Sequence, residues 1–300
     1  MYFGRIMTAM ATPFDHQQRV DVEGIHTLVN HLISTGTDAI IACGTTGESP
    51  VLSDEERALV ISETVKAAKK RVPVIAGTGS NNTAQSIAVT KSAEVLGADG
   101  IMLVTPYYNR PSQEGLFQHF SAIVKETKLP VMLYNVPGRT AVNLLADTVI
   151  RLSALDNVVA LKEATDDFTK ISAIIEGTPN DFHVYTGEDH LTLPAVAVGC
   201  SGVVSVASHL FGAEMNKMLD AYFNGSPALA AQIHRDLTPR MKALFMAPSP
   251  SPLKAALTYT GLPAGSVRLP LLPLDEAETE QLTSTLFGPR IVSQQQKNIP

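Results

Sequence analysis

Short apolar runs recur along the chain, and each leads into a longer stretch with helical periodicity. Apolar, β-branched runs of about four to eight residues are typical of strands that are buried on both faces. Stretches with apolar positions three and four residues apart are typical of helices that cover such a sheet. The expected strands are 5–10, 38–43, 73–77, 100–105, 130–135, 157–162, 182–186 and 202–206.

The stretches between these strands are expected to be helical, and several begin with a residue that caps a helix N-terminus. Ser53 is followed three residues later by Glu56, which is the spacing of a capping box. Asn82 and Ser112 provide weaker forms of the same signal. The expected helices are 22–35, 53–70, 82–97, 112–127, 143–154, 167–176, 189–198 and 208–224.

Strands that alternate with helices predict an α/β fold with a parallel sheet. Units of about 20–35 residues, repeated about eight times, favour a closed (β/α)8 TIM barrel over an open doubly wound sheet. The sequence G-x-G-x-x-G is absent after the first strand, and the segment 77–79 (GTG) is too short to replace it. We therefore expect a barrel over residues 1–224 that has no dinucleotide site.

The alternation ends near residue 224. Segments 226–246, 250–260 and 274–286 have helical periodicity and are separated by stretches that contain proline or glycine. We expect them to form a C-terminal helical region, 225–290, that packs on the barrel as an extension. Residues 291–300 lack an apolar period, and we expect a flexible tail there.

Composition and charge exclude several classes of function. The 300 residues are 45% hydrophobic, which is enough for one large core, and the net charge is −6 with scattered basic residues. This distribution is unlike a nucleic-acid-binding surface. The sequence shows neither a signal peptide nor an apolar run that could span a membrane, so we expect a soluble, cytoplasmic protein. Cys43 and Cys200 are far apart in apolar surroundings, so we expect reduced, buried thiols.

Lys162 is the most informative residue of the chain. It directly follows the apolar run 158–161 and therefore ends a buried strand. Burial disfavours the charged form of lysine and lowers its pKa from ~10.4 by up to several units. A lysine that titrates at about 7–8 is partly a free amine near neutral pH and can attack a ketone to form a Schiff base. The alternative is a lysine that ends a strand and points to water.

Polar side chains gather at the carboxyl ends of the other expected strands, which is where a (β/α)8 barrel carries its chemistry. Thr45 can relay a proton, and Tyr108 and Tyr134 can act as general acid or base. Arg139 can hold a carboxylate through two parallel hydrogen bonds, and Thr46 can help to bind a second one. Each group also has an ordinary explanation, as part of a tight turn, a rim aromatic or a surface arginine. Their convergence on one buried lysine favours a catalytic site.

Two further polar residues are expected to be structural. Glu163 is expected to pair with a neighbouring cation or to cap a loop, and His183 is expected to be a hydrogen-bonded core residue within its strand. None of the eight histidines lies at metal-ligand spacing from another ligand, so we predict no metal site.

Together these segments resemble the dihydrodipicolinate synthase family, whose relatives include N-acetylneuraminate lyase and other pyruvate-dependent aldolases. The resemblance covers about residues 1–290. The motifs that carry it are GTTGES at 44–49, GTGSN at 77–81, VTPYYNRPSQEGL at 104–116, YNVPGRT at 134–140 and ALKEA at 160–164. The combination is specific, whereas GTTGE or a single lysine would not be.

The resemblance implies roles for the catalytic residues. Lys162 would form a Schiff base with pyruvate, without an external cofactor. Tyr134 would donate and accept the proton for that step, in a relay with Thr45 and Tyr108. Tyr108 would reach into the site of a neighbouring subunit, so the site would need a dimer. The expected homo-oligomer is a dimer of dimers, a homotetramer, although some members of the family stop at the dimer.

The resemblance also implies how the substrates are bound. Thr46 would hold the pyruvate carboxylate, and Arg139 would hold the carboxylate of the second substrate, L-aspartate 4-semialdehyde. Gly187 and Val204 match positions near the lysine. The condensation would be the committed step of diaminopimelate and lysine biosynthesis.

Two other functions are alternatives. A lyase or aldolase of the same superfamily would act on N-acetylneuraminate or a 2-keto-3-deoxy sugar acid. Such lyases resemble Gly-Ser-Thr-Gly-Glu at the first motif and lack an arginine matching Arg139, so Thr45 and Arg139 favour the synthase. A non-catalytic keto-acid-binding barrel is the other alternative, but such a protein would be free to lose Lys162 or Tyr134.

One departure from the family concerns an allosteric pocket at the dimer interface. Members inhibited by lysine tend to carry a histidine or tryptophan and a glutamate there. The matching positions here are Asp54, Arg57 and Gln85, with Ser49, Asn81 and Tyr107 retained. Neutral Gln85 removes a charge-assisted hydrogen bond worth about 1.5–3 kcal/mol, and Arg57 adds a charge of the same sign as the lysine ammonium. We therefore expect this pocket to be non-functional and feedback inhibition by lysine to be weak or absent.

Overall fold

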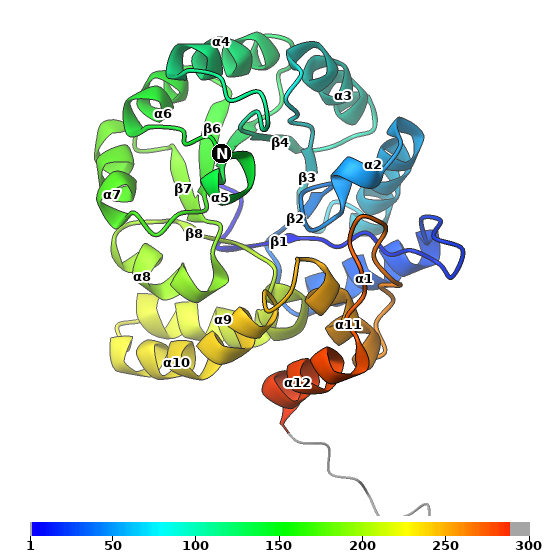
Figure 1. Cartoon of the computed structure of the whole chain (residues 1–300). Helices are drawn as coiled ribbons and strands as arrows, with labels where there is room; N and C mark the ends of the chain where they lie inside the picture. Colours follow the sequence, from blue (N-terminus) through cyan, green and yellow to red (C-terminus); the bar gives the residue numbers. More distant parts are fainter. Residues whose placement is uncertain (1, 289–300) are drawn as a thin grey trace, which may run out of the picture.

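The computed structural model describes residues 2–288, and its centre is a closed barrel of parallel strands. The strands follow one another around the barrel in chain order, and β8 pairs with β1 to close it (Figure 1). This confirms the predicted (β/α)8 barrel and each of its strands. The bounds are β1 Ile6–Ala9, β2 Ala39–Ala42, β3 Val74–Gly77, β4 Gly100–Val104, β5 Val131–Asn135, β6 Val158–Glu163, β7 His183–Thr186 and β8 Gly202–Ser205.

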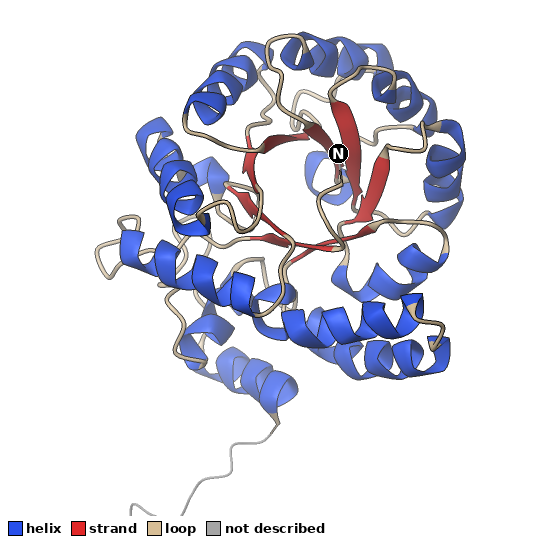
Figure 2. Cartoon of the chain, turned by 180° about the vertical axis from the view of Figure 1, so that it is seen from behind, coloured by secondary structure: helices blue, strands red, loops and turns tan. Residues whose placement is uncertain are grey.

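Helices surround the barrel on its outer side (Figure 2). They are α1 Val22–Ser34, α2 Asp54–Ala68, α3 Thr83–Val95, α4 Gln113–Val124, α6 Ala146–Ser153, α7 Phe168–Gly177, α8 Thr192–Ala197 and α9 Ser208–Phe223, with short 3-10 helices η1 Ser49–Val51 and η2 Asp189–Leu191. The short helix α5 Pro137–Thr140 lies instead over one end of the barrel (Figure 1). The sequence analysis did not predict α5 or η1, because a single turn is too short to show a helical period.

The predicted helix starts are confirmed by their hydrogen bonds. The Ser53 hydroxyl accepts from the backbone N–H of Glu56, and the Glu56 carboxylate accepts from the backbone N–H of Ser53. The side chains of Asn82 and Ser112 cap α3 and α4 in the simpler way. These caps satisfy backbone donors that a helix start otherwise leaves without a partner.

Two apolar layers support the barrel, one inside the strands and one between the strands and the helices. Alternate residues of each strand point to opposite sides, so both layers take side chains from the same strands. The interior layer includes Met7, Ile41, Ile75, Met102, Met132, Tyr134, Tyr185 and Val204. The outer layer joins the strands to the apolar faces of the helices, and it is the larger of the two.

Three further helices follow the barrel: α10 Pro227–Ala243, α11 Ser251–Tyr259 and α12 Glu276–Phe287. They lie beside α9 and α1 (Figure 1), and their buried leucines belong to the same apolar cluster as those of α1. The C-terminal helical region therefore shares a core with the barrel. The predicted boundary at residue 224 falls in the turn between α9 and α10. The predicted tail, 291–300, lies outside the described residues.

The two cysteines are free and buried, as the sequence analysis predicted. Burial raises the pKa of both the Cys43 and the Cys200 thiol to about 12. Both side chains are therefore thiols rather than thiolates near neutral pH. Between residues 2 and 288, the structure contains no helix that is long and apolar enough to cross a membrane.

Phe120 on α4 tests the packing of the outer layer, because its side chain is 0% exposed. Phe120→Ala removes the ring and leaves a cavity, so the free energy of unfolding should fall by about 3–5 kcal/mol. Chemical denaturation followed by circular dichroism measures this change. As a control, Val95→Ala alters a side chain that is 87% exposed, and it should change the free energy by less than about 0.5 kcal/mol. Equal losses for both variants would contradict the packing described above.

Candidate active site

Lys162 lies at the carboxyl end of β6 and is 6% exposed. Its nearest neighbours in the sheet register are Tyr134 on β5 and Tyr185 on β7. The lysine is therefore enclosed by the barrel rather than directed to water, which confirms its predicted burial.

Tyr134 and Gly187 are close to the Lys162 side chain. The Lys162 Nζ atom lies 4.2 Å from the centroid of the Tyr134 ring, and Tyr134 is 4% exposed. A Cβ atom placed on Gly187 would come within 2.9 Å of the Lys162 Cε atom. Glycine at this position therefore leaves the space that the lysine side chain occupies. The predicted proximity of Gly187 to the lysine is confirmed, while its contact with a substrate stays a prediction.

Thr45 and Tyr134 line the same small cavity at the end of the barrel. The end of β3 comes close to the loop after β2 beside this cavity because Gly77 has no side chain. A Cβ atom on Gly77 would lie 2.3 Å from the carbonyl oxygen of Cys43, which is closer than atoms can approach. Tyr134 therefore links the buried Lys162 to the half-buried Thr45 in one largely buried group.

Thr46 follows Thr45 in the loop after β2 and is buried. The backbone N–H of Glu48 donates to the carbonyl of Thr45 at 3.0 Å and closes a turn around Thr46. The Thr12 hydroxyl donates to the carbonyl of Gly47 at 2.7 Å. The loop that carries both threonines is held by its own backbone and by the loop after β1.

Two of the predicted site residues are exposed and do not join the buried group. Tyr108 is 91% exposed and has a φ of 70°, in the left-handed region that is unfavourable for residues other than glycine. Arg139 lies in the short helix α5 and is also exposed. Val204, another predicted residue, is buried in β8 beside Met7 of β1. The substrate contacts predicted for these three residues stay predictions.

Glu188 lies directly after Gly187, and the sequence analysis gave it no role. Burial raises the pKa of its carboxyl group, and the charges of His190, Lys162 and Arg139 partly oppose this shift. Glu188 therefore adds a carboxyl group within electrostatic reach of both Lys162 and Arg139. The sequence signal that could have identified Glu188 is its position in the loop after β7, since Thr45 occupies the corresponding loop after β2.

Asp189 is buried and holds the loop after β8. Its Oδ2 atom accepts hydrogen bonds from the backbone N–H groups of Val206 and Ala207, at 3.0 and 2.9 Å. Burial raises the pKa of the carboxyl group, while these hydrogen bonds favour its ionised form. The sequence analysis gave Asp189 no role, since its partners come from another loop.

Glu163 is structural, as predicted. Its Oε2 atom lies 2.9 Å from the Nζ atom of Lys170 on α7, and its Oε1 atom accepts from Asn135 at 2.9 Å. Burial raises the pKa of Glu163 even though Lys170 favours the ionised form. Because Glu163 directly follows Lys162, this pair holds the end of the strand that carries the lysine.

His183 begins β7, and its Nδ1 atom lies 3.0 Å from the hydroxyl of Ser201. It is half-buried rather than fully in the core, but it has the hydrogen-bond partner that was expected. Within the part of the chain that the structure describes, no group of three or more His, Cys, Asp and Glu side chains could hold a metal ion.

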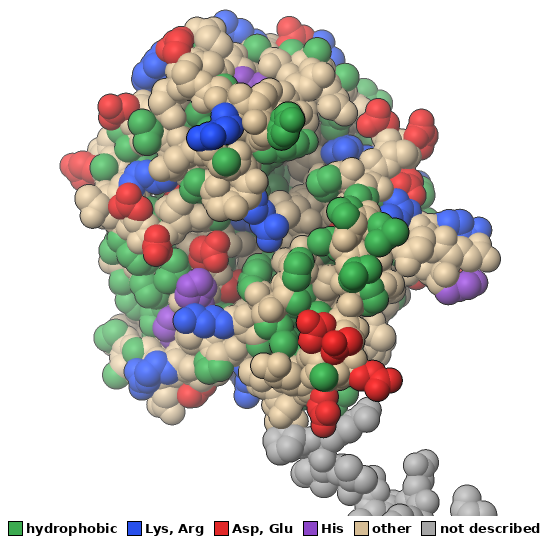
Figure 3. All heavy atoms as spheres, in the orientation of Figure 1, with side chains coloured by type: hydrophobic (Ala, Val, Ile, Leu, Met, Phe, Trp, Pro, Cys, Tyr) green, Lys and Arg blue, Asp and Glu red, His purple; other side chains and the backbone are tan. Residues whose placement is uncertain are grey.

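The face of the molecule that carries α5 shows charges of both signs (Figure 3). Lysine and arginine side chains alternate there with aspartate and glutamate, without a continuous basic area on this face. Such a surface does not favour binding to a nucleic-acid backbone.

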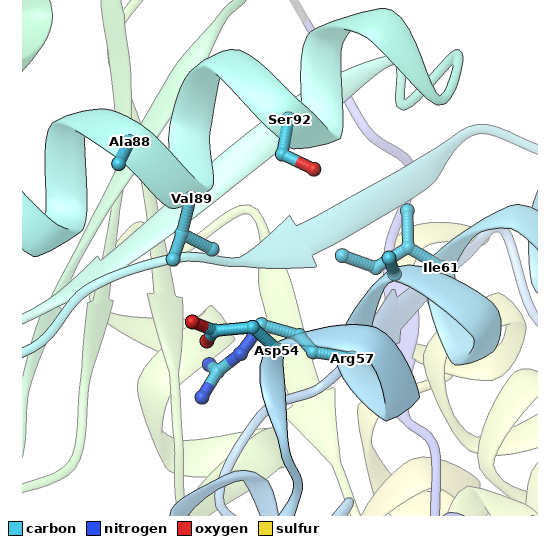
Figure 4. Close-up of a pocket in the computed structure, with 7 residues that line it drawn as sticks. Asp54, Arg57, Ile61, Ala88, Val89 and Ser92 are labelled. Carbon is cyan, nitrogen blue, oxygen red and sulfur yellow. The ribbon is translucent and has the colours of Figure 1, made fainter.

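The residues predicted for regulation lie around α2 and α3. Asp54 and Arg57 on α2 line a pocket together with Ser92 and other residues of α3, and Figure 4 shows the two charged side chains next to each other. Gln85 is exposed in the first turn of α3 and does not line this pocket. Gln85 lies one helical turn before Ala88 and Val89, which line this pocket.

The other predicted regulatory residues are joined in pairs by hydrogen bonds to backbone carbonyls. The Arg57 guanidinium donates to the carbonyl of Ser49 at 3.3 Å, and the Asn81 side chain donates to the carbonyl of Tyr107 at 3.2 Å.

Comparison with known proteins identifies the family. Residues 2–287 match the model of the dihydrodipicolinate synthetase (DHDPS) family. The chain is 57% identical over 287 residues to 4-hydroxy-tetrahydrodipicolinate synthase of Bacillus subtilis (strain 168), which covers 95% of this chain and 99% of that relative. Dihydrodipicolinate synthase from Bacillus anthracis is 54% identical with a TM-score of 0.94, over 95% of this chain and 98% of that one. DHDPS from Cyanidioschyzon merolae, solved with lysine bound, is 42% identical with a TM-score of 0.93, over the same shares of 95% and 98%. The chain therefore belongs to the dihydrodipicolinate synthetase family.

Proposed function

We propose that this enzyme condenses pyruvate with L-aspartate 4-semialdehyde through a Schiff base on Lys162, without an external cofactor. By its relatives it is a lyase with 4-hydroxy-tetrahydrodipicolinate synthase activity, in diaminopimelate and lysine biosynthesis. The observation that carries the Schiff-base proposal is the buried Lys162 amine, 4.2 Å from the centroid of the Tyr134 ring. A buried amine beside a phenol has both the nucleophile and the proton carrier that imine formation needs.

The first half of the reaction takes place at Lys162. The amine adds to the keto carbon of pyruvate, and loss of water leaves an iminium ion. Tyr134 donates and accepts the protons, and Thr45, which lines the same cavity, passes them on. The Thr46 hydroxyl holds the pyruvate carboxylate beside the lysine. The iminium then acts as an electron sink, so that loss of a methyl proton gives an enamine.

The second half joins the two substrates. The enamine carbon attacks the aldehyde carbon of L-aspartate 4-semialdehyde, whose carboxylate binds the guanidinium of Arg139. Gly187 and Val204 line the space beside the lysine. The amino group of the new chain then displaces Lys162 by transimination, which closes a six-membered ring and frees the enzyme. Exposure of Arg139 at the mouth of the site suits a contact with the substrate that enters second.

Tyr108 completes the proton relay from the neighbouring subunit, so the active enzyme is a homodimer or a dimer of dimers. Its proposed location is the cytoplasm. A tyrosine that is 91% exposed, with a φ of 70°, is poorly placed in an isolated subunit. Such a conformation persists when surrounding contacts stabilise it. A partner subunit that receives the ring would provide those contacts.

Borohydride trapping with pyruvate, followed by intact mass and peptide mapping, tests the Schiff base. We expect one pyruvate-derived group on Lys162, because borohydride reduces the iminium to a stable amine. Lys162→Ala should give no adduct, whereas Lys128→Ala, which changes an exposed lysine, should behave as the unchanged protein does.

The same sample should be assayed with L-aspartate 4-semialdehyde and with N-acetylmannosamine. We expect turnover of the semialdehyde only. Turnover of the sugar would favour the lyase. If Lys162 stayed unmodified, the Schiff-base mechanism would be wrong, and the alternative of a non-catalytic keto-acid-binding barrel would remain.

Mixing inactive variants tests the shared site. Tyr108→Phe and Lys162→Ala subunits should both be nearly inactive alone, but a hybrid dimer contains one site with both native side chains. Equal mixing with free exchange makes half of the dimers hybrid, so about a quarter of the original activity should return in a two-fold symmetric dimer. Steady-state kinetics after subunit exchange measures this recovery. A mixture that stays inactive, although native mass spectrometry shows hybrids, would contradict the role of Tyr108.

Weak feedback inhibition is expected from Arg57 and Gln85. Arg57 repels the ammonium group of lysine, and neutral Gln85 cannot provide a charge-assisted hydrogen bond to it. Half-inhibition by lysine should therefore need more than about 1 mM, equivalent to binding weaker than about −4 kcal/mol. Initial rates at rising lysine concentration measure it, with Gln85→Glu as the variant expected to be more sensitive. Half-inhibition well below 1 mM in the unchanged protein would show that the pocket functions.

A further inference from the structure

Glu48 belongs to the GTTGES motif, yet it has no part in the chemistry described above. It is 3% exposed, and its Oε1 atom lies 2.6 Å from the Nζ atom of Lys254, which is 2% exposed. Lys254 lies on α11, in the C-terminal helical region. Burial lowers the pKa of Lys254 to about 8, although Glu48 favours its charged form. Removal of these two charges from water therefore has a large unfavourable free energy, as is typical of buried ion pairs.

The C-terminal region holds both oxygen atoms of Glu48. Lys254 contacts Oε1, and the backbone N–H of Arg268 donates to Oε2 at 2.9 Å. Lys254 also donates to the carbonyl of Ser266 at 2.9 Å and lies 4.0 Å from the centroid of the Phe14 ring. Glu48 is therefore bound from two points of the chain that follow the barrel in sequence.

Arg268 extends these contacts to the start of α2. Its guanidinium donates to both oxygen atoms of Glu56, the residue that completes the capping box of α2. It also donates to the carbonyl of Val51 at 3.0 Å and lies 4.2 Å from the centroid of the Phe14 ring. The segment from Glu48 to Glu56 is thus attached to the C-terminal region at three of its residues, Glu48, Val51 and Glu56.

The backbone of Glu48 links these contacts to the active site. Its φ of 55° lies in the left-handed region, which a residue with a side chain adopts only where its surroundings enforce it. Its N–H group donates to the carbonyl of Thr45, and this bond closes the turn that contains Thr46. A change in the position of the Glu48 side chain would therefore move the turn that presents both threonines.

We infer that the buried ion pair between Glu48 and Lys254 positions Thr45 and Thr46 for catalysis, so that the C-terminal helical region is part of the catalytic apparatus. The inference rests on the proposed roles of the two threonines. Glu48 and Lys254 are positioning residues, since they act through the loop after β2. A purely stabilising role would not explain why this site holds an ion pair, because apolar side chains often replace a buried ion pair without loss of stability.

Three variants separate positioning from stability. Lys254→Met leaves the Glu48 carboxylate buried and unpaired, so its melting temperature should fall. The double variant Glu48→Gln/Lys254→Met removes the unpaired charge and should regain most of that temperature. Leu257→Ala is the control: it truncates a fully buried apolar side chain on the same helix without changing a charge, and should lower the melting temperature as well.

Steady-state kinetics, measured at a temperature where all three variants are folded, distinguish a positioning role from a stabilising one. Lys254→Met and the double variant should both raise the KM for pyruvate by about tenfold or more and slow borohydride trapping, because small displacements of catalytic groups have large effects on rate. Leu257→Ala should leave the KM unchanged. If Lys254→Met does not fold, Glu48→Gln alone should still raise the KM for pyruvate, by a smaller factor.

Two outcomes would overturn the inference. If the KM of the double variant returned to normal together with its melting temperature, the pair would only stabilise the fold. If Leu257→Ala raised the KM as much as Lys254→Met, the kinetic effect would follow from general destabilisation. Failure of the unchanged protein to form the pyruvate adduct would be distinct from both, since it would overturn the proposed function and, with it, the roles of the threonines.

Discussion

Burial of an amine at the end of β6 is the constraint on which the rest of this structure depends. Lys162 lies between tyrosines of the two adjacent strands, and its side chain is largely removed from water. The next residue, Glu163, points to the other side of the sheet and pairs with Lys170 on α7. One strand end therefore carries a buried amine on the inside of the barrel and a buried ion pair on the outside. The outer pair fixes the strand that presents the inner amine.

The loops around Lys162 are held by contacts that come from distant parts of the chain. Because Gly77 has no side chain, the end of β3 approaches the loop after β2 within a distance that a Cβ atom would prevent. Asp189, which begins η2, holds the loop after β8 by accepting from two backbone N–H groups. Lys254 reaches the loop after β2 through Glu48. Barrel and C-terminal region thus share a core and also share the support of the site.

Much of this architecture could be predicted from local patterns. Strand periods, helix periods and the capping box at Ser53 depend on residues a few positions apart, and the structure confirms them. Lys162, Tyr134 and Thr45 could also be brought together in advance, because carboxyl ends of parallel strands meet at one end of a barrel. The single turns α5 and η1 could not be found, since a turn of three or four residues has no period.

The sequence by itself determined the alternation of strands and helices, the closure expected of eight such units and the strand ends that carry the chemistry, because each follows from short-range spacing. Only the tertiary structure decided which charges neutralise one another. Glu48 and Lys254, like Glu56 and Arg268, lie on elements that are remote in the sequence. The local pattern around each of these residues does not show which charge it will meet, and for Glu48 and Lys254 burial makes the pairing necessary.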